Sequence, residues 1–171
     1  MRWKWITAFS FCLIVGIAAL IATEKKTDGK ALSYTNQDDM VCLAKNIYFE
    51  AATESTAGKI AVAWTVLNRV RHSKFPNSIC EVVEQGLKYS NGVPKRDLCQ
   101  FSWYCDGRSD EIRNIRVWRD SYRLATYVAS GRDYLLDITD GSLFYHAHYV
   151  QPKWAKYKRK TAKIDTHIFY R

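Results

Sequence analysis

The sequence predicts a mainly helical α+β domain that ends in a small β-hairpin and is preceded by one N-terminal transmembrane or signal helix. Three observations support this fold class: an uncharged N-terminal segment, helical spacing of apolar residues through the middle of the chain, and strand-like alternation near its end. With 171 residues, of which 47% are hydrophobic, the chain has room for one compact domain with its own core.

The N-terminal segment, residues 5–23, contains no charged side chain. As a helix it spans about 28 Å, close to the roughly 30 Å of a bilayer core. It is either an uncleaved signal-anchor with its N-terminus inside, or a cleaved signal peptide, since residues 16–18 offer the small side chains that a signal peptidase reads. A buried soluble helix is the third alternative, which the uniformly apolar sequence disfavours. Both main alternatives export the rest of the chain. Residues 24–37 then form a tether, and residues 38–171 the functional domain.

Four helices are predicted from apolar spacing and from residues that cap helices. Residues 38–53 form the first, with acidic side chains favourably placed at its N-terminus. Residues 59–70 are apolar nearly all round and predict a central core helix. Residues 78–84 form a short helix, and residues 110–130 form a longer one.

Irregular and extended segments complete the domain. Residues 86–107 contain several glycines and predict a long loop, and a long loop in a compact domain is usually functional. Residues 141–150 and 164–170 predict two strands that pair as a hairpin. The basic run between them, residues 153–163, is either a solvated loop or a substrate-binding surface.

Four cysteines follow the apolar segment, and an export signal followed by four cysteines predicts two disulfides in an oxidising compartment. Three pairings are open. We favour Cys99 with Cys105, which closes a short loop, and Cys42 with Cys80, which ties two helices together. A metal site is the weaker alternative, because the chain has no Cys-x-x-Cys motif and its His-x-His pair alone is too small a ligand set. We therefore expect no metal and no other cofactor.

The charge balance and the aromatic content indicate a polymeric partner. The formal charge is +9, and aromatic residues make up 14% of the chain. A strongly basic protein favours an anionic partner, such as nucleic acid, anionic lipid or an anionic wall polymer, and aromatic rings stack on sugars and bases alike. Because export and disulfides argue against nucleic acid, we expect no nucleic-acid partner. We also expect a monomer.

Glu50 is the candidate catalytic residue. It lies in the first predicted helix among apolar neighbours, and partial desolvation raises the pKa of a carboxylic acid, so that it holds a proton near neutral pH. A general acid needs that property. Glu54 follows one helical turn later on the same face. The alternative is that both carboxylates are ordinary surface charges of the helix.

Four ordered blocks of sequence resemble the SleB-type cell-wall hydrolases, a family known from spore cortex-lytic enzymes, proteobacterial wall hydrolases and phage lysis enzymes. Together they cover about residues 40–155 in the order and spacing of the family. After Glu50 the chain departs from the family's Ala-Arg-Gly-Glu pattern, since Ala51-Ala52-Thr53-Glu54 lacks the Arg and the Gly. The blocks are Cys42–Ala51, Gly58–Val62 with Val66–Val70, parts of Phe75–Gly107, and Leu143–His146 with Pro152–Trp154.

The resemblance implies a lysozyme-related domain that cuts the MurNAc–GlcNAc bond of peptidoglycan, in cell-wall remodelling or phage host lysis. It implies Glu50 as the single catalytic residue of a lytic transglycosylase. From its spacing, we interpret Glu54 as a residue that supports the site. A hydrolytic muramidase or glucosaminidase is the first alternative, and it needs a second carboxylate such as Glu54 or Asp106. A non-catalytic peptidoglycan-binding membrane protein is the second. The domain then lies on the periplasmic side of the inner membrane, held by residues 5–23, or is secreted to the wall.

Six residues are candidates for substrate binding. Small polar groups between the last two cysteines suit hydrogen bonds to acetamido groups, whereas the aromatic and histidine candidates serve either the groove or the core. Asn68 and Arg69, at the end of the apolar helix, are expected to fix a loop and not to touch the sugar. The six candidates are Gln100, Phe101, Ser102, Tyr145, His146 and Trp154.

Overall fold

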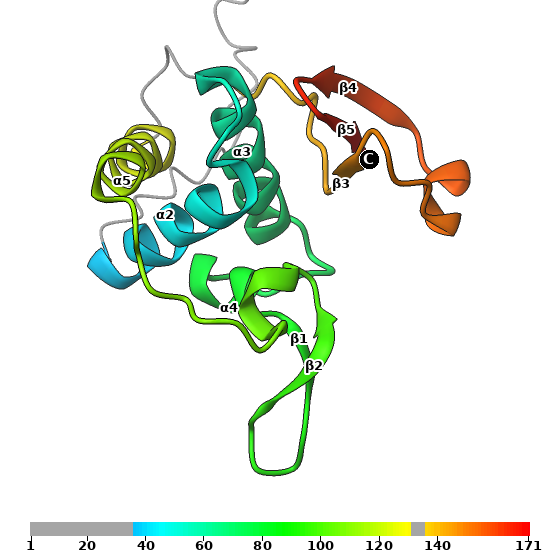
Figure 1. The fold of residues 1–171 in the computed structure, drawn as a ribbon. Helices are drawn as coiled ribbons and strands as arrows, with labels where there is room; N and C mark the ends of the chain where they lie inside the picture. The colour runs from blue at the N-terminus through cyan, green and yellow to red at the C-terminus, as the bar shows by residue number, and fades with distance from the viewer. Residues whose placement is uncertain (1–35, 131–135) are drawn as a thin grey trace, which may run out of the picture. The chain divides into compact units, whose positions relative to one another are not determined.

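A computed structural model describes residues 36–130 and 136–171, which belong to one compact unit (Figure 1). The expected N-terminal helix at residues 5–23 and nearly all of the expected tether lie outside these ranges. Among the described residues, no helix combines the length and the apolar character that a membrane crossing requires.

The four predicted helices are all present in the described part of the chain, and the fold class is α+β as expected. Helices α2, α3 and α5 are long, whereas α4 is little more than one turn. Their bounds are α2 (Gln37–Ala51), α3 (Thr56–Arg71), α4 (Ile79–Val83) and α5 (Ile115–Ala129).

Side-chain caps determine where these helices begin. Ser55 caps α3 by accepting a hydrogen bond from the backbone of Gly58, so the helix starts before the predicted Lys59. The prediction that α5 begins at residue 110 was wrong. Asn114 caps this helix by accepting from the backbone N–H groups of its second and third residues, and residues 110–114 are not helical.

Helix α3 is the central helix of the core, as its apolar sequence predicted, and it packs against α2, α4 and α5. Val66 and Leu67 at its centre are completely buried. This burial of aliphatic side chains from several helices is the main source of the domain's stability. The core also contains Leu43 and Ile47 of α2, Ile79 and Val82 of α4, and Ala125 and Val128 of α5.

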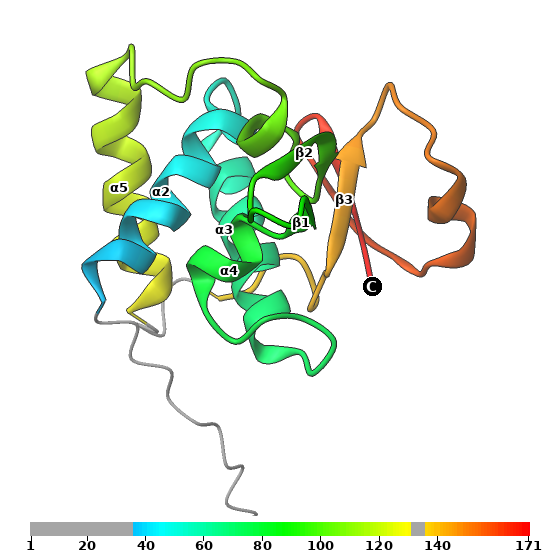
Figure 2. The ribbon, with the colours of Figure 1, turned by 90° about the horizontal axis from the view of Figure 1, so that it is seen from below.

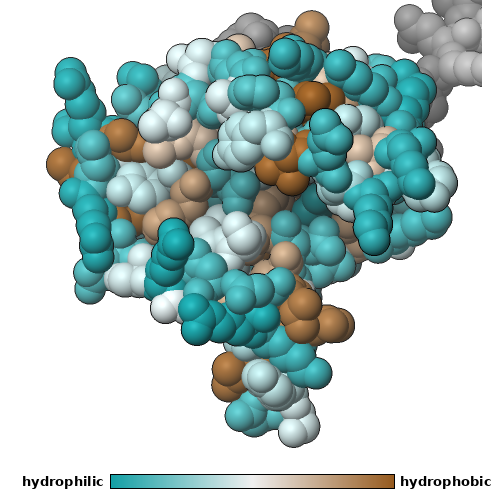
Figure 3. Space-filling view, turned by 45° about the vertical axis from the view of Figure 1, so that its right-hand side comes forward, coloured by the Kyte–Doolittle hydropathy of each residue, from teal (hydrophilic) through white to brown (hydrophobic). Residues whose placement is uncertain are grey.

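An antiparallel hairpin occupies residues 86–99, where the sequence predicted a loop. Strand β1 (Gly86–Lys88) pairs with β2 (Pro94–Cys99), and the backbone N–H of Tyr89 donates to the carbonyl of Val93 across the turn. The hairpin extends away from the helices in Figure 1. Apolar residues stand out on this protruding segment in Figure 3. Because neither face of the hairpin is buried, its sequence lacks the apolar alternation by which strands are recognised.

The second sheet has three strands where the sequence predicted a hairpin of two. The strands lie in the order β3-β5-β4, and both pairs are antiparallel. Figures 1 and 2 show this sheet on one side of α2 and α3, with α5 on the other. The strands are β3 (Phe144–Ala147), β4 (Lys160–Ile164) and β5 (His167–Tyr170).

The predicted strand 164–170 is divided between β4 and β5. Asp165, with a φ of 48°, makes the turn, and β5 pairs with β3 as expected. Strand β4 comes from the basic run 153–163, whose first part forms the 3-10 helix η2 (Lys153–Tyr157). The many lysines of this run favour a solvated loop, which is why the sequence did not predict the third strand.

Two disulfides join elements of the described domain, and both have the pairing that we favoured. Cys42–Cys80 links α2 to α4. Cys99–Cys105 links the end of β2 to the 3-10 helix η1 (Ser102–Cys105), which follows the first hairpin. The second disulfide therefore closes the short loop that contains Gln100, Phe101 and Ser102.

Candidate active site

A cleft of about 560 Å³ lies where the end of α2 meets strands β3 and β5 and the segment that follows β2. Glu50 of α2 lies within it. The cleft is lined by charged, polar and aromatic side chains from parts of the chain far apart in sequence. They include Glu50, Arg69, Gln100, Phe101, Ser102, Asp106, Arg108, Asp110, Tyr145, His146, Tyr149 and His167.

Glu50 is held in the last turn of α2, with its carboxyl group in the cleft. The hydroxyl of Tyr145 donates a hydrogen bond of 2.9 Å to its Oε2. Burial raises the pKa of Glu50 above its ordinary value, and this effect exceeds the opposing effects of the Tyr145 hydrogen bond and the Arg69 charge. The geometry thus provides a carboxylic acid that keeps its proton to higher pH, as the sequence predicted.

Tyr145 reaches Glu50 from β3, on the opposite side of the cleft from α2. Its ring packs edge-on against His167, with the centroids 5.0 Å apart, and in a tilted arrangement against Phe169, with the centroids 5.6 Å apart. Burial raises the pKa of the Tyr145 hydroxyl well above its usual range, and the nearby Glu50 carboxylate raises it further. The hydroxyl is therefore a fixed hydrogen-bond donor to Glu50.

Arg69 brings a buried positive charge to the same cleft. The side chain is only 4% exposed, its Nε donates to the carbonyl of Leu143 at 2.7 Å, and its Nη1 has no hydrogen-bond partner in the described residues. Its guanidinium lies 5.0 Å from the ring centroid of Phe101 and 5.3 Å from that of Phe75. Burial lowers the pKa of Arg69 to about 10, although Tyr145 and Glu50 oppose the shift, so the group remains a cation at neutral pH.

The expectation that Asn68 and Arg69 fix a loop is confirmed by their contacts. Asn68 donates to the carboxylate of Asp137 at 2.8 Å and to the carbonyl of Ser142 at 3.2 Å, next to the contact between Arg69 and Leu143. Sequence reasoning missed that Arg69 also lines the cleft. The available signal was a cation between Leu67 and Val70 in a mostly apolar helix, because such a charge needs a specific environment when it is buried.

The segment after β2 forms the polar rim of the cleft. Gln100 and Ser102 are exposed there, whereas Phe101 between them is only 2% exposed and packs beneath Arg69. The Asp106 carboxylate accepts a hydrogen bond of 2.8 Å from the backbone of Arg108. Burial raises the pKa of Asp110, the Lys45 charge opposes this shift, and Asp106 reinforces it. Two further carboxyl groups, Asp106 and Asp110, therefore share the cleft with Glu50.

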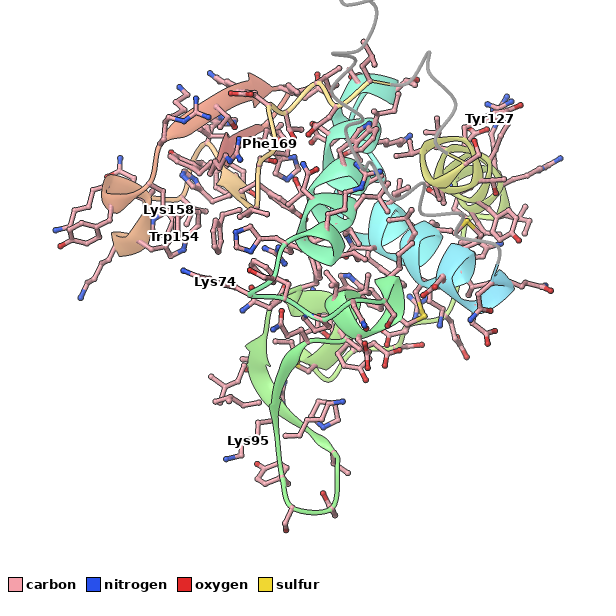
Figure 4. The ribbon with its side chains drawn as sticks, turned by 180° about the vertical axis from the view of Figure 1, so that it is seen from behind. Lys74, Lys95, Tyr127, Trp154, Lys158 and Phe169 are labelled. Carbon is pink, nitrogen blue, oxygen red and sulfur yellow. A yellow bond between two sulfur atoms is a disulfide. The ribbon has the colours of Figure 1, made fainter. Side chains whose placement is uncertain are left out.

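Two of the predicted substrate-binding residues have mainly structural contacts. His146 borders the cleft, but its ring nitrogens lie 2.9 Å from the Ala147 carbonyl and 2.9 Å from the Tyr170 hydroxyl. Trp154 does not line this cleft. It lies on η2 beside Lys158 (Figure 4), and its ring packs against Phe144, His146 and Tyr170.

Glu54 lies outside the cleft and holds the turn between β4 and β5. Its carboxylate accepts hydrogen bonds from the Thr166 hydroxyl at 2.6 Å and from the Thr166 backbone at 3.2 Å. Next to it, Asp165 accepts two bonds from Ser55. These contacts position β5, and with it His167, whose ring lies in the cleft against Tyr145.

No group of three or more His, Cys, Asp or Glu side chains within residues 36–130 and 136–171 is arranged to hold a metal ion. The chemistry that this cleft offers is that of a partly desolvated carboxylic acid with a phenol and a guanidinium beside it. Such an acid can donate a proton to a leaving oxygen and can be stabilised as the carboxylate afterwards.

Comparison with solved structures finds the same fold in two bacterial proteins. The catalytic domain of the Bacillus cereus SleB protein is 25% identical, with 80% of this chain and 91% of that chain covered and a TM-score of 0.59. The catalytic domain of the germination-specific lytic transglycosylase SleB from Bacillus anthracis has the same identity and TM-score, with 80% of this chain and 96% of that chain covered. A comparison with curated protein sequences gives no significant match.

The family model described as Cell Wall Hydrolase matches residues 53–170. This range contains Arg69, Tyr145 and the polar rim of the cleft, and it begins shortly after Glu50. The match spans most of the chain and agrees with the structural similarity to the SleB catalytic domains. The chain therefore belongs to the cell wall hydrolase family.

Proposed function

We propose that this protein cleaves the glycan strands of peptidoglycan by lytic transglycosylation at the MurNAc–GlcNAc bond, with Glu50 as the only catalytic carboxyl group. The observation that carries the proposal is the Glu50 carboxyl group, whose pKa is raised by burial and which accepts a hydrogen bond from Tyr145 in a cleft with polar rims. Membership of the cell wall hydrolase family supports peptidoglycan as the substrate.

In the first step, protonated Glu50 donates its proton to the glycosidic oxygen that joins MurNAc to GlcNAc. The bond between this oxygen and C1 of MurNAc breaks, the GlcNAc-ended strand leaves as an alcohol, and positive charge develops at C1. In the second step, the C6 hydroxyl of the same MurNAc attacks C1 and returns its proton to Glu50. The product is a 1,6-anhydro sugar, no water is consumed, and Glu50 ends in its starting state.

Tyr145 and Arg69 act on the carboxylate that forms between these steps. The Tyr145 hydroxyl already points at Oε2 of Glu50, and the Arg69 cation lines the same cleft. Both favour the ionised form of Glu50, so they stabilise negative charge that grows as the proton leaves. Because these donors are fixed before the reaction, no reorganisation is required when the charge develops.

Hydrolysis is the second candidate, because the cleft holds further carboxyl groups. Asp106 and Asp110 line it together with Glu50, and Asp110 has a raised pKa. A hydrolase that inverts or retains configuration uses a second carboxylate as water base or nucleophile. Glu54 is less suited to that role, since both of its oxygens accept hydrogen bonds from Thr166 outside the cleft.

We further propose that the domain acts after export, on the periplasmic side of the inner membrane with residues 5–23 as its anchor, or free at the wall after cleavage. The two disulfides support an oxidising compartment. The charge of +9 favours adhesion to an anionic wall. The biological role is then wall remodelling or, in a phage, lysis of the host.

Digestion of purified peptidoglycan by the full chain and by the variants Glu50→Gln and Glu54→Gln tests this function. We expect Glu50→Gln to lower the initial rate by about 100-fold to 10,000-fold, because it removes the general acid. Glu54→Gln should lower the rate by about tenfold or less, because it loosens the β4–β5 turn without touching the proton transfer. Equal and complete loss in both variants, with folding intact, supports a two-carboxylate hydrolase, and full activity of Glu50→Gln excludes the proposed chemistry.

A further inference from the structure

A second cavity, of about 460 Å³, lies between η2 and the face of the second sheet that points away from Glu50. Side chains of a strand alternate between its two faces, so His167 of β5 lines the Glu50 cleft, whereas Ile168 and Tyr170 line the second cavity. His146 of β3 borders both, and His148, just after β3, lines the second cavity. Its other lining residues are Val150, Gln151, Pro152, Lys153, Ala155 and Lys156.

The lining of the second cavity is basic and contains no carboxyl group. Lys153 and Lys156 lie three residues apart on a 3-10 helix, and such residues project to the same side. Lys156 lies 4.8 Å from the ring centroid of Tyr157, and in the described part of the chain neither lysine has a carboxylate within 4.0 Å. The whole stretch 141–164 has six Lys or Arg residues and no Asp or Glu. One of the six, Arg159, pairs with Asp140 just before the stretch, and the remaining excess of cations favours an anionic ligand.

Aromatic and hydrogen-bonding contacts join the residues at the floor of this cavity. His146 stacks on Tyr170 with ring centroids 5.2 Å apart, and its Nε2 lies 2.9 Å from the Tyr170 hydroxyl. Trp154, on η2, packs edge-on against Tyr170, with the ring centroids 5.4 Å apart. A concave site with a fixed, partly apolar floor and a few converging cations suits a ligand that combines aliphatic groups with carboxylates.

We propose that the second cavity binds carboxylates of the stem peptide that peptidoglycan carries on the lactyl group of MurNAc. This inference rests on the proposed function. Strand β3 is an edge strand of its sheet, so a peptide can pass over it from the Glu50 cleft to the second cavity. Three or four extended residues, at roughly 3.3 Å each, reach about 10–13 Å across the edge of the sheet.

The consequence is a preference for glycan that carries its peptides. The contacts are made equally in the ground state and in the transition state, so they lower KM without changing kcat. Lys153 and Lys156 each form one exposed charge pair with a carboxylate of the stem peptide. The two pairs together raise kcat/KM by about tenfold. The substitutions Lys153→Glu and Lys156→Glu reverse both charges and should abolish this preference.

The experiment compares soluble glycan oligomers with stem peptides and the same oligomers after an amidase has removed the peptides. We expect the full chain to have a kcat/KM about tenfold higher on the peptide-bearing oligomers. The double variant Lys153→Glu/Lys156→Glu should lose this advantage through KM alone, and Lys153→Gln/Lys156→Gln should lose part of it. The matched control is Arg116→Glu/Arg119→Glu, the same charge change at exposed positions three residues apart on α5, and it should keep the full preference.

Several outcomes overturn the inference. The first is that the full chain cleaves both substrates at equal rates, and the second is that the lysine variants keep the preference. The third is that the arginine control loses as much of the preference as the lysine variants do. The fourth is that kcat falls in the lysine variants. If the lysine variants cleave more slowly only on wall material that still carries phosphate polymers, the cavity binds phosphate and not the stem peptide. Failure of the proposed function is distinct, because the full chain then cleaves neither substrate.

Discussion

At the scale of single residues, the state of Glu50 depends on opposing effects of its neighbours. Burial raises its pKa, while Tyr145 and Arg69 lower it. An acid catalyst needs both influences, since it has to hold a proton before the reaction and to release it during the reaction. Tyr145 is the neighbour best suited to a test, because a substitution can remove its hydroxyl, which donates the hydrogen bond to Glu50, and keep the ring.

Tyr145→Phe removes that hydrogen bond and keeps the buried ring. The pKa of Glu50 should rise further, because the bond favours the ionised form, and activity that requires protonated Glu50 should then persist to higher pH. The limiting rate should fall by about 10-fold to 100-fold, since a hydrogen bond to a charged group contributes about 1.5–3 kcal/mol. A pH profile of kcat/KM checks both effects. An alkaline limb that moves to lower pH, or does not move, contradicts the role given to Tyr145.

Much of the candidate site could be predicted at the residue scale, and the exceptions have physical reasons. The structure gathers Glu50, Gln100, Ser102 and Tyr145 around one cleft, as the ordered motifs suggested. Arg69 and His167 were missed as cleft residues because their place depends on which face of a helix or strand turns inward. Trp154 has the chemistry of a sugar-stacking residue, but it does not line the Glu50 cleft, and its ring packs against Phe144, His146 and Tyr170.

At the scale of elements, helices were more predictable than strands. The four helices have apolar spacing and capping side chains, which are local signals. The hairpin of β1 and β2 is exposed, with Leu87 at 60% and Leu98 at 51%, so no buried face produces alternation. Strand β4 lies in the basic run, and it is stabilised by pairing with β5, a contact that local sequence does not encode.

The two disulfides join elements over different distances along the chain, and this predicts different contributions to stability. The half-cystines of Cys42–Cys80 are 38 residues apart, and those of Cys99–Cys105 are 6 apart. Loop closure in the unfolded chain gives about 4 kcal/mol for the first bond and about 2 kcal/mol for the second. Denaturant unfolding of the double alanine variants measures both values. A larger loss for Cys99→Ala/Cys105→Ala than for Cys42→Ala/Cys80→Ala contradicts this account.

At the scale of the whole domain, the two cavities differ in their charge. The Glu50 cleft is lined by carboxyl groups and by Arg69 and Arg108, whereas the second cavity is lined by basic groups and by no carboxyl group. Edge strand β3 borders both of them. This arrangement matches a substrate whose glycan is largely neutral and whose peptides carry carboxylates, and it gives the domain's positive charge a more specific role than adhesion to the wall.

The central claim is that Glu50 acts alone and that no water enters the reaction. Digestion of purified peptidoglycan by the full chain in water enriched with heavy oxygen, followed by mass spectrometry of the new glycan ends, tests it most directly. The account predicts 1,6-anhydro-MurNAc ends without heavy oxygen, formed at least about 100-fold more slowly by Glu50→Gln. Reducing ends that carry heavy oxygen would show hydrolysis and would contradict it.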